Sequence, residues 1–297
     1  MEARVQDFSK LVEKATLQLG KEKGKTGQLQ VLGRLVKIKP LGETVVIGDL
    51  HGDLESLVQI LQDSKILQRM KESQSVFLIF LGDYGDRGDF SAEIYYTVLK
   101  FKLQYPTQVI LMRGNHEGPK DLLAFPHDLP AQFQTRFGPE WTDAYDKIFQ
   151  LSDYLYNSVL VEERFFIVHG GLPQEARTLE DFAHAHEKYP KRRFLEDMLW
   201  SDPVDSLQGV YPSPRGAGNL FGKNITTEIL KSLGVKILIR GHEPCSDGYK
   251  IDHDGKILTL FSRKGAPYYN KYGAYLDVKL AKKFPSAEQL LPHVHKF

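Results

Sequence analysis

The chain has 297 residues, of which 41% are apolar and 26% charged, so it can bury a full hydrophobic core and disorder is not expected. Lysine and arginine number 39 against 38 aspartate and glutamate residues. This balance gives no bulk electrostatic reason to expect a nucleic acid or an anionic membrane as partner. The single cysteine, Cys245, excludes an intrachain disulfide and favours a cytoplasmic location. A membrane span is not expected either, because the longest apolar run covers only residues 76–81.

No repeat, low-complexity tract or long linker interrupts the sequence, so a single domain over residues 1–297 is predicted. Apolar residues recur at helical spacing over residues 3–19, and after a stretch rich in glycine and lysine a second helical pattern runs to about Ile38. We therefore predict an N-terminal helical cap over residues 1–42. A core over residues 43–279 and a C-terminal tail over residues 280–297 follow it.

From residue 44 the pattern changes to short apolar runs separated by helical stretches. Residues 44–47, 76–81 and 109–112 are typical of buried parallel strands, and helices near residues 53–63 and 90–104 connect them. This β-α-β-α-β order predicts an α/β fold with right-handed crossovers, in which functional sites lie at the carboxyl ends of the strands.

The second half of the chain adds further predicted strands. They cover residues 155–161, 164–168, 236–239, 256–261 and 274–278. The late strands are joined by tight turns such as Asp254-Gly255, which favours antiparallel pairing. We therefore expect a second, mixed sheet.

Polar side chains beside glycine follow five of the predicted buried strands. These tips are Gly48-Asp49-Leu50-His51-Gly52, Gly82-Asp83-Tyr84-Gly85-Asp86-Arg87-Gly88, Arg113-Gly114-Asn115-His116-Glu117, His169-Gly170-Gly171 and Gly241-His242-Glu243. Strands of one sheet place their carboxyl ends along a common edge, so we expect the tips to converge in one crevice. Glycine suits these positions because the backbone turns sharply and approaches a ligand closely.

The converging side chains have the chemistry of metal ligands. The candidates are Asp49, His51, Asp83, Asn115, His169 and His242. Oxygen and imidazole ligands without a thiolate suit Mn, Fe or Zn better than calcium or a structural zinc site. Six groups exceed the needs of one catalytic ion, which predicts two ions that share a carboxylate and activate a water. Arg87, four residues after Asp83, is the nearest cation for a phosphate oxygen.

The five tips, in this order, resemble those of the PPP-family serine/threonine protein phosphatases of the calcineurin-like metallophosphoesterase superfamily. The resemblance covers roughly residues 43–279. Segments 199–203 (LWSDP), 247–249 (DGY) and 258–262 (LTLFS) are also similar to the protein phosphatase branch. Diadenosine tetraphosphatase relatives would not be expected to carry the Trp-Ser-Asp-Pro segment. The compact layout resembles prokaryotic and archaeal members.

The resemblance implies a metallophosphoesterase-type two-sheet β-sandwich, with mixed sheets flanked by helices, and hydrolysis of phosphoserine and phosphothreonine monoesters of proteins. A hydroxide bound to a dinuclear metal centre would attack directly, without a phosphoenzyme, and inorganic phosphate would be released. Manganese is the expected metal, with iron and zinc as alternatives. Asp49 and His51 would bind the first ion and Asp83 would bridge, while the second ion would be held by Asn115, His169 and His242.

By the same resemblance His116 protonates the leaving oxygen and Asp86 orients its imidazole and keeps it protonated. Arg87 and Arg215 match the phosphate-binding arginines of the family. Asn115 and Tyr269 are also assigned to substrate binding. Residues 262–269 depart from the family pattern, which leaves open whether Tyr268 or Tyr269 covers the site.

Several alternatives stay open from sequence alone. Arg87 can instead pair with Asp86 or Asp89, and Arg215 can be a solvent-exposed residue of a loop rich in proline and glycine. A nucleotide polyphosphate hydrolase and a non-catalytic binding module are the rival functions. Activity on phosphotyrosine, oligomeric state and regulatory subunits are not predicted.

Overall fold

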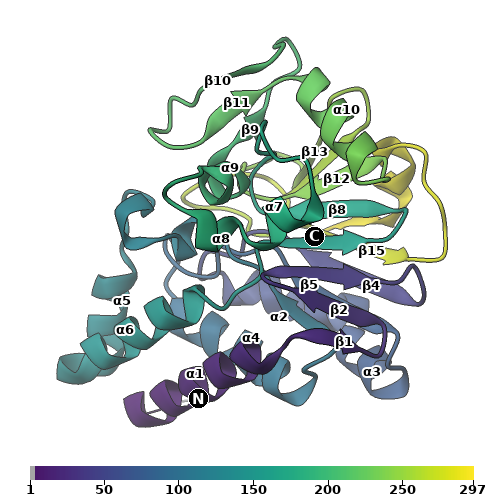
Figure 1. Cartoon of the computed structure of the whole chain (residues 1–297). Coiled ribbons are helices and arrows are strands. Elements are labelled where there is room, and N and C mark those ends of the chain that lie inside the picture. Colours follow the sequence, from purple (N-terminus) through teal and green to yellow (C-terminus); the bar gives the residue numbers. More distant parts are fainter. Residues whose placement is uncertain (1–3) are drawn as a thin grey trace.

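The computed structural model describes residues 4–297 and shows an α/β arrangement in which two mixed sheets are flanked by helices (Figure 1). The predicted fold class is therefore confirmed. The eight strands of the first sheet are, in spatial order, β1 (Gly24–Thr26), β2 (Leu29–Leu32), β3 (Leu35–Ile38), β7 (Ser158–Val161), β8 (Phe165–Val168), β12 (Ile237–Arg240), β14 (Ile257–Leu260) and β13 (Tyr249–Asp252).

The second sheet has five strands and carries the parallel unit that the sequence predicted. In spatial order they are β16 (Val294–Lys296), β15 (Ala274–Lys279), β4 (Glu43–Ile47), β5 (Val76–Phe80) and β6 (Val109–Leu111). β4, β5 and β6 are parallel, and β15 pairs antiparallel with β4. One continuous core contains apolar side chains of both sheets, including Val46 of β4 and Ile239 of β12.

Helices connect and flank these strands. They are α1 (Val5–Lys21), α2 (Leu54–Ser64), α3 (Ile66–Glu72), α4 (Ser91–Gln104), α5 (Leu129–Phe137), α6 (Trp141–Ser152), α7 (Leu179–Ala183), α8 (Ala185–Lys188), α9 (Phe194–Trp200) and α10 (Lys223–Ser232). A small third sheet, β10 (Val210–Pro212), β11 (Asn219–Phe221) and β9 (Asp202–Pro203), lies beside α9. Within residues 4–297, none of the helices has both the length and the apolar character needed to span a bilayer.

The prediction of an N-terminal helical cap is correct only for its first helix. α1 is present, but the predicted second helix up to Ile38 is wrong, because this segment forms β1, β2 and β3. Gly27 and Gly33 adopt positive φ values of 59° and 51° and close the two turns between these strands, a conformation that glycine adopts without steric cost. β3 then pairs in parallel with β7, so the apolar residues are buried inside the first sheet.

The C-terminal tail is also part of the fold. Residues 287–293 form a 3₁₀ helix whose Leu290 is buried, and β16 pairs antiparallel with β15, placing Val294 opposite Leu276. The tail therefore extends the second sheet at its edge. β16 completes the pairing that the edge of β15 would otherwise leave open.

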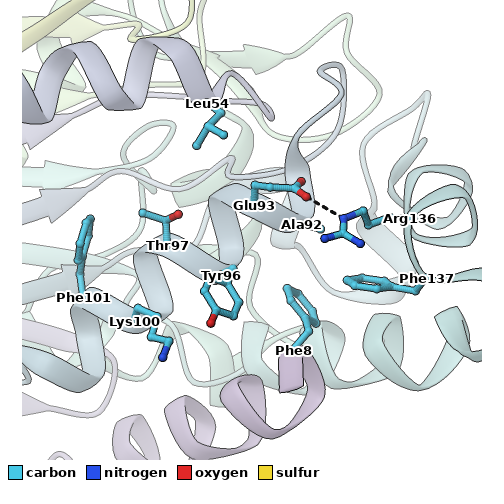
Figure 2. Close-up of a pocket in the computed structure, with 10 residues that line it drawn as sticks. All are labelled: Phe8, Leu54, Ala92, Glu93, Tyr96, Thr97, Lys100, Phe101, Arg136 and Phe137. Atoms are coloured by element: carbon cyan, nitrogen blue, oxygen red, sulfur yellow. Dashed lines mark hydrogen bonds and ion pairs between the residues drawn. The ribbon is translucent and has the colours of Figure 1, made fainter. Parts of the chain in front are cut away.

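An apolar pocket of about 290 Å³ lies among α1, α4 and α5 (Figure 2). Phe8 of α1 contacts Phe133 and Phe137 of α5, with ring centroids 5.5 and 5.0 Å apart. Arg136 and Glu93 form an ion pair at 2.8 Å on one wall. This aromatic contact anchors α1 to the helices that follow the third strand tip.

Candidate active site

Four of the five polar strand tips line one cavity of about 530 Å³, and His169 of the remaining tip contacts Asn115 of its wall. The prediction that all five tips belong to one sheet is wrong: the first three tips follow β4, β5 and β6 of the second sheet, while the other two follow β8 and β12 of the first. The carboxyl ends of these parallel strands face each other across the interface between the sheets. Residues lining the cavity include His51, Asp83, Arg87, Asn115, His116, Trp200, Arg215, His242 and Tyr268.

The backbone at the tips is held in conformations that non-glycine residues rarely adopt. The φ values of His51, Asp83, Asp86, Arg87 and His242 are all positive, between 43° and 73°. Such residues persist only where the surroundings hold them, and they gather at functional sites. The second and third tips also approach very closely, since a Cβ on Gly82 would lie 2.2 Å from the backbone nitrogen of the residue at 114.

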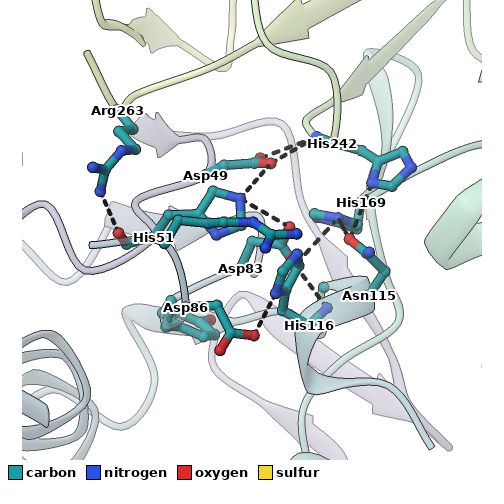
Figure 3. A network of polar contacts seen from close by, with 12 residues as sticks. Asp49, His51, Asp83, Asp86, Asn115, His116, His169, His242 and Arg263 are labelled. Atoms are coloured by element: carbon teal, nitrogen blue, oxygen red, sulfur yellow. Dashed lines mark hydrogen bonds and ion pairs between the residues drawn. The ribbon is translucent and has the colours of Figure 1, made fainter. Parts of the chain in front are cut away.

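One cluster of hydrogen-bond acceptors surrounds His51 (Figure 3). Its Nδ1 donates to the carbonyl of Gly85 at 2.9 Å, so Nε2 presents a lone pair. That nitrogen lies 3.4 Å from Asp83 Oδ2 and 3.8 Å from Asp49 Oδ2. Lone pairs facing lone pairs, with no proton between them, indicate a place for a cation.

A second acceptor cluster shares Asp83 with the first. His169 donates from Nδ1 to the carbonyl of Leu81 at 3.0 Å, and its Nε2 faces Asn115 Oδ1 at 3.0 Å and Asp83 Oδ1 at 3.5 Å. His242 Nδ1 lies 3.0 Å from the same Asn115 oxygen. The amide of Asn115 can turn either its oxygen or its nitrogen toward these atoms, and the oxygen is the face that a metal ion binds.

The electrostatics of both clusters favour a bound cation. Burial raises the pKa of Asp49 to about 7 and that of Asp83 well above its ordinary value. Burial also holds the pKa of His51, His169 and His242 well below the usual range, so these rings are neutral, as metal ligation requires. Ligand atoms of His51, Asp83 and His116 lie within 4.8 Å of one another, as do those of Asp83, His169 and His242. The residues present therefore fit two divalent ions that share Asp83.

His116 and Asp86 form a tight pair beside the clusters. His116 Nδ1 lies 2.5 Å from Asp86 Oδ2, and Asp86 Oδ1 accepts the backbone N–H groups of Asp128 and Leu129 at 3.0 and 2.7 Å. Burial works to raise the pKa of Asp86, but the hydrogen bonds from His116 and His127 prevail and hold it well below its ordinary value. Asp86 is therefore an ionised acceptor that orients the His116 ring.

Glu117 fixes the second and third tips to each other. Its carboxylate accepts backbone N–H groups of Asp83, Tyr84 and Gly114 at 2.8 to 3.0 Å, and the Tyr95 hydroxyl at 2.8 Å. Four donors to one buried carboxylate hold the backbone rigidly around Asp83. Asp53, by contrast, caps α2 by accepting the N–H of Ser56 at 3.0 Å.

The two predicted phosphate-binding arginines both line the cavity. Arg87 donates to the carbonyls of Pro126 at 2.7 Å and Phe125 at 3.4 Å. No carboxylate of residues 4–297 lies within ion-pair distance of its guanidinium, so the proposed pairs with Asp86 and Asp89 do not form. Arg215 donates to Asp202 at 2.7 Å and stays 37% exposed at the side chain, so it is neither fully solvated nor buried.

Tyr268, and not Tyr269, lies at the cavity. The Tyr268 ring is 5.5 Å from that of His51 and 5.0 Å from that of Phe261, whereas Tyr269 is 83% exposed and does not line the cavity. Tyr269 is a turn residue with φ 57°, whose N–H donates to Gly265 at 2.6 Å. The assignment of Tyr269 to substrate binding is therefore wrong.

Comparison with known proteins agrees with this geometry. A family model described as calcineurin-like phosphoesterase matches residues 43–246. The chain belongs to this family. A probable serine/threonine-protein phosphatase of Encephalitozoon cuniculi is 33% identical over 250 residues, which cover 82% of this chain and 51% of the relative. The serine/threonine-protein phosphatase 4 catalytic subunit of Saccharomyces cerevisiae is 32% identical over 226 residues, which cover 75% of this chain and 69% of the relative.

These relatives place the chain in the PPP branch that its motifs resemble. The chain spans about half the length of the first curated relatives it matches, with 51% for the E. cuniculi protein and 43% for serine/threonine-protein phosphatase 5 of Arabidopsis thaliana. Among solved structures, a serine/threonine phosphatase from Saccharomyces cerevisiae has a TM-score of 0.76 at 22% identity, covering 93% of this chain and 83% of that one. A cold-active protein tyrosine phosphatase has a TM-score of 0.60 at 16% identity, and the match covers 84% of this chain and 77% of that one. Both likenesses show the fold.

Two further residues at the site, Asp202 and His127, were not predicted from the sequence. Asp202 accepts hydrogen bonds from Arg215 and from the fully buried Arg240, at 2.7 and 2.8 Å, and so links the arginine at the cavity to β12. His127 donates to Asp86 at 2.9 Å from a segment without a predicted element. The one signal that could have found His127 is its position in the loop that follows the His116 tip.

Proposed function

We propose that this phosphoesterase hydrolyses phosphoserine and phosphothreonine monoesters of proteins. The observation that carries the proposal is the pair of acceptor clusters sharing Asp83, directly beside His116 and Asp86 and next to the cavity arginines. The names of the relatives, serine/threonine-protein phosphatases, support the choice of substrate.

Two divalent ions would occupy the acceptor clusters. The first ion would be held by Asp49 and His51. The second ion would be held by Asn115, His169 and His242, and Asp83 would bind both ions. We propose manganese, with iron and zinc as alternatives, because the donors combine carboxylate and amide oxygens with imidazole and include no thiolate. When bound, such ions lower the pKa of a coordinated water and neutralise charge on phosphate oxygens.

The remaining chemistry belongs to side chains of the chain itself. Arg87 and Arg215 would bind phosphate oxygens, for which a guanidinium offers paired N–H donors. As the oxygen of a water molecule forms a bond to phosphorus, the bond between phosphorus and the serine or threonine oxygen breaks, and its electron pair stays on that oxygen. His116 would protonate it from Nε2, since Nδ1 is bound to Asp86. Asp86 stabilises the imidazolium until the proton leaves.

The proposal is tested with metal-stripped protein and a phosphoserine peptide, before and after addition of Mn²⁺, Fe²⁺ or Zn²⁺. A phosphotyrosine peptide and a dinucleoside tetraphosphate are assayed in parallel. We expect phosphate release from the phosphoserine peptide to return with metal and to be fastest with Mn²⁺. Activity on the nucleotide alone would refute the proposed substrate. Metal binding without turnover on any of the three would refute the enzyme assignment.

A further inference from the structure

His127 lies behind the pair of His116 and Asp86. Its Nδ1 is 2.9 Å from Asp86 Oδ2, the same oxygen that His116 approaches to 2.5 Å. The other oxygen of Asp86 accepts the N–H groups of Asp128 and Leu129. Four donors therefore surround a carboxylate that is only 1% exposed, and three of them come from residues 127–129.

Tyr145 of α6 determines which nitrogen of His127 carries the proton. The Tyr145 hydroxyl lies 2.8 Å from His127 Nε2. Burial, and after it the charge of Asp86, raises the pKa of Tyr145 to about 12, so the hydroxyl keeps its proton and can donate a hydrogen bond to Nε2 of the ring. The ring proton of neutral His127 is then on Nδ1, which suits Asp86, because an ionised carboxylate only accepts.

The segment that carries His127 also holds the phosphate-binding Arg87. Pro126 and Phe125 supply the carbonyls for its guanidinium, and the carboxylate of Asp128 accepts its backbone N–H at 3.0 Å. His127 itself does not line the cavity, and its side chain is 14% exposed. It therefore reaches the reaction only through Asp86.

We infer that His127 is a positioning residue for proton donation: with Tyr145 behind it, it holds Asp86 so that His116 is aimed at the leaving oxygen. The inference rests on the proposed function. Without His127, Asp86 Oδ2 would keep a single donor, and water would enter the space that the imidazole fills. The carboxylate could then rotate, and the His116 ring would lose its fixed orientation.

The test compares His127→Leu, which removes the donor, with His127→Asn, whose amide N–H can occupy the place of Nδ1. For His127→Leu we expect kcat on a phosphoserine peptide to fall about tenfold or more, and kcat on p-nitrophenyl phosphate to stay within about twofold, because nitrophenolate leaves without a proton. His127→Asn should recover most of the peptide rate. Tyr145→Phe should give a smaller loss with the same dependence on the leaving group.

A second readout needs no turnover. Nitrogen NMR of the histidine rings in metal-stripped protein should show His127 protonated on Nδ1, and Tyr145→Phe should mix the two tautomers. His184→Asn, which changes a histidine that pairs with Glu180 and Glu187, is the matched control and should keep wild-type rates. The inference would be overturned if His127→Leu slowed both substrates equally or slowed neither. A proton on Nε2 of wild-type His127 would overturn it as well.

The proposed function can fail separately. If the wild-type protein cleaves a nucleotide substrate but no phosphoserine peptide, the proposed substrate is wrong. The role of His127 is then decided by the same comparison of leaving groups on phosphate esters that it does cleave, together with the tautomer measurement.

Discussion

Asp83 connects the two acceptor clusters, since each of its carboxylate oxygens faces a different histidine. We predict that Asp83→Asn weakens binding of both ions roughly 100-fold or more, because even partners outside the ligand set are worth 10- to 100-fold. Metal content after dialysis measures this, with the exposed Asp63→Asn as control. Full occupancy of both ions in the Asp83 variant would contradict the shared site.

The role of His116 in proton donation can be separated from metal binding. His116→Asn should lower kcat on a phosphoserine peptide by about 10²- to 10⁴-fold, the range of general acid catalysis, and leave metal content unchanged. The cause is loss of the proton donor next to Asp86. Unchanged turnover on this substrate, whose leaving group is poor, would remove His116 from the mechanism.

At the scale of residues, the sequence predicted the site residues that directly follow buried strands, but it did not predict those that lie in loops. Asp49 and His242 could be brought together because both follow buried strands, and the structure joins them through the His242 N–H, which lies 3.0 Å from Asp49 Oδ1. Tyr269 was misplaced because neighbouring residues of an irregular turn point in different directions. His127 was missed because its partner, Asp86, is 41 residues away and no periodicity connects them.

At the scale of elements, β2 and β3 show how glycine decides between two patterns. Apolar residues between 29 and 38 fit both a helix and two short strands, and the turn at Gly33 selects the strands. The parallel strands β4, β5 and β6 were predictable, because each is a buried apolar run flanked by helices. Which sheet each later strand joins could not be predicted, because pairing between distant segments leaves no local pattern.

The turn at Gly33 leads to a prediction about stability. A Cβ at this position would lie 2.4 Å from the carbonyl oxygen of Ala183, and φ is 51°. Gly27 has φ 59° but nothing within 4 Å. Gly27→Ala should therefore cost about 1–2 kcal/mol of unfolding free energy for the backbone conformation alone, and Gly33→Ala clearly more. Urea denaturation of both variants measures this, and equal losses would contradict the close contact.

At the scale of the whole molecule, stability is linked to pH through the buried acceptors. In the metal-free chain Asp49, with its pKa raised to about 7, binds its proton more tightly than the unfolded chain does. Its contribution to stability is present below about pH 4 and is lost as the pH rises through 7. The buried histidines act in the opposite direction, because their lowered pKa values make the folded state lose stability below about pH 6.5.

Bound metal should offset the cost of the ionised carboxylates. We predict that Mn²⁺ at 100 times the dissociation constant of a site stabilises the fold by about 2.7 kcal/mol for each occupied site. At a fixed Mn²⁺ concentration the rise in Tm should be larger at pH 8 than at pH 6, where protons compete for the ligands. Thermal unfolding with and without Mn²⁺ measures this. A larger rise at pH 6 would contradict the linkage, and Asp83→Asn should show little rise at either pH.

The spread of the tips along the chain has a consequence for synthesis. The ligand candidates begin at Asp49 and end at His242, and they come from both sheets. A nascent chain on the ribosome therefore cannot offer the complete ligand set until β12 and the residue after Gly241 have left the exit tunnel. The order of translation makes completion of the proposed dinuclear site a late event, after all the segments from β4 to β12 have been made.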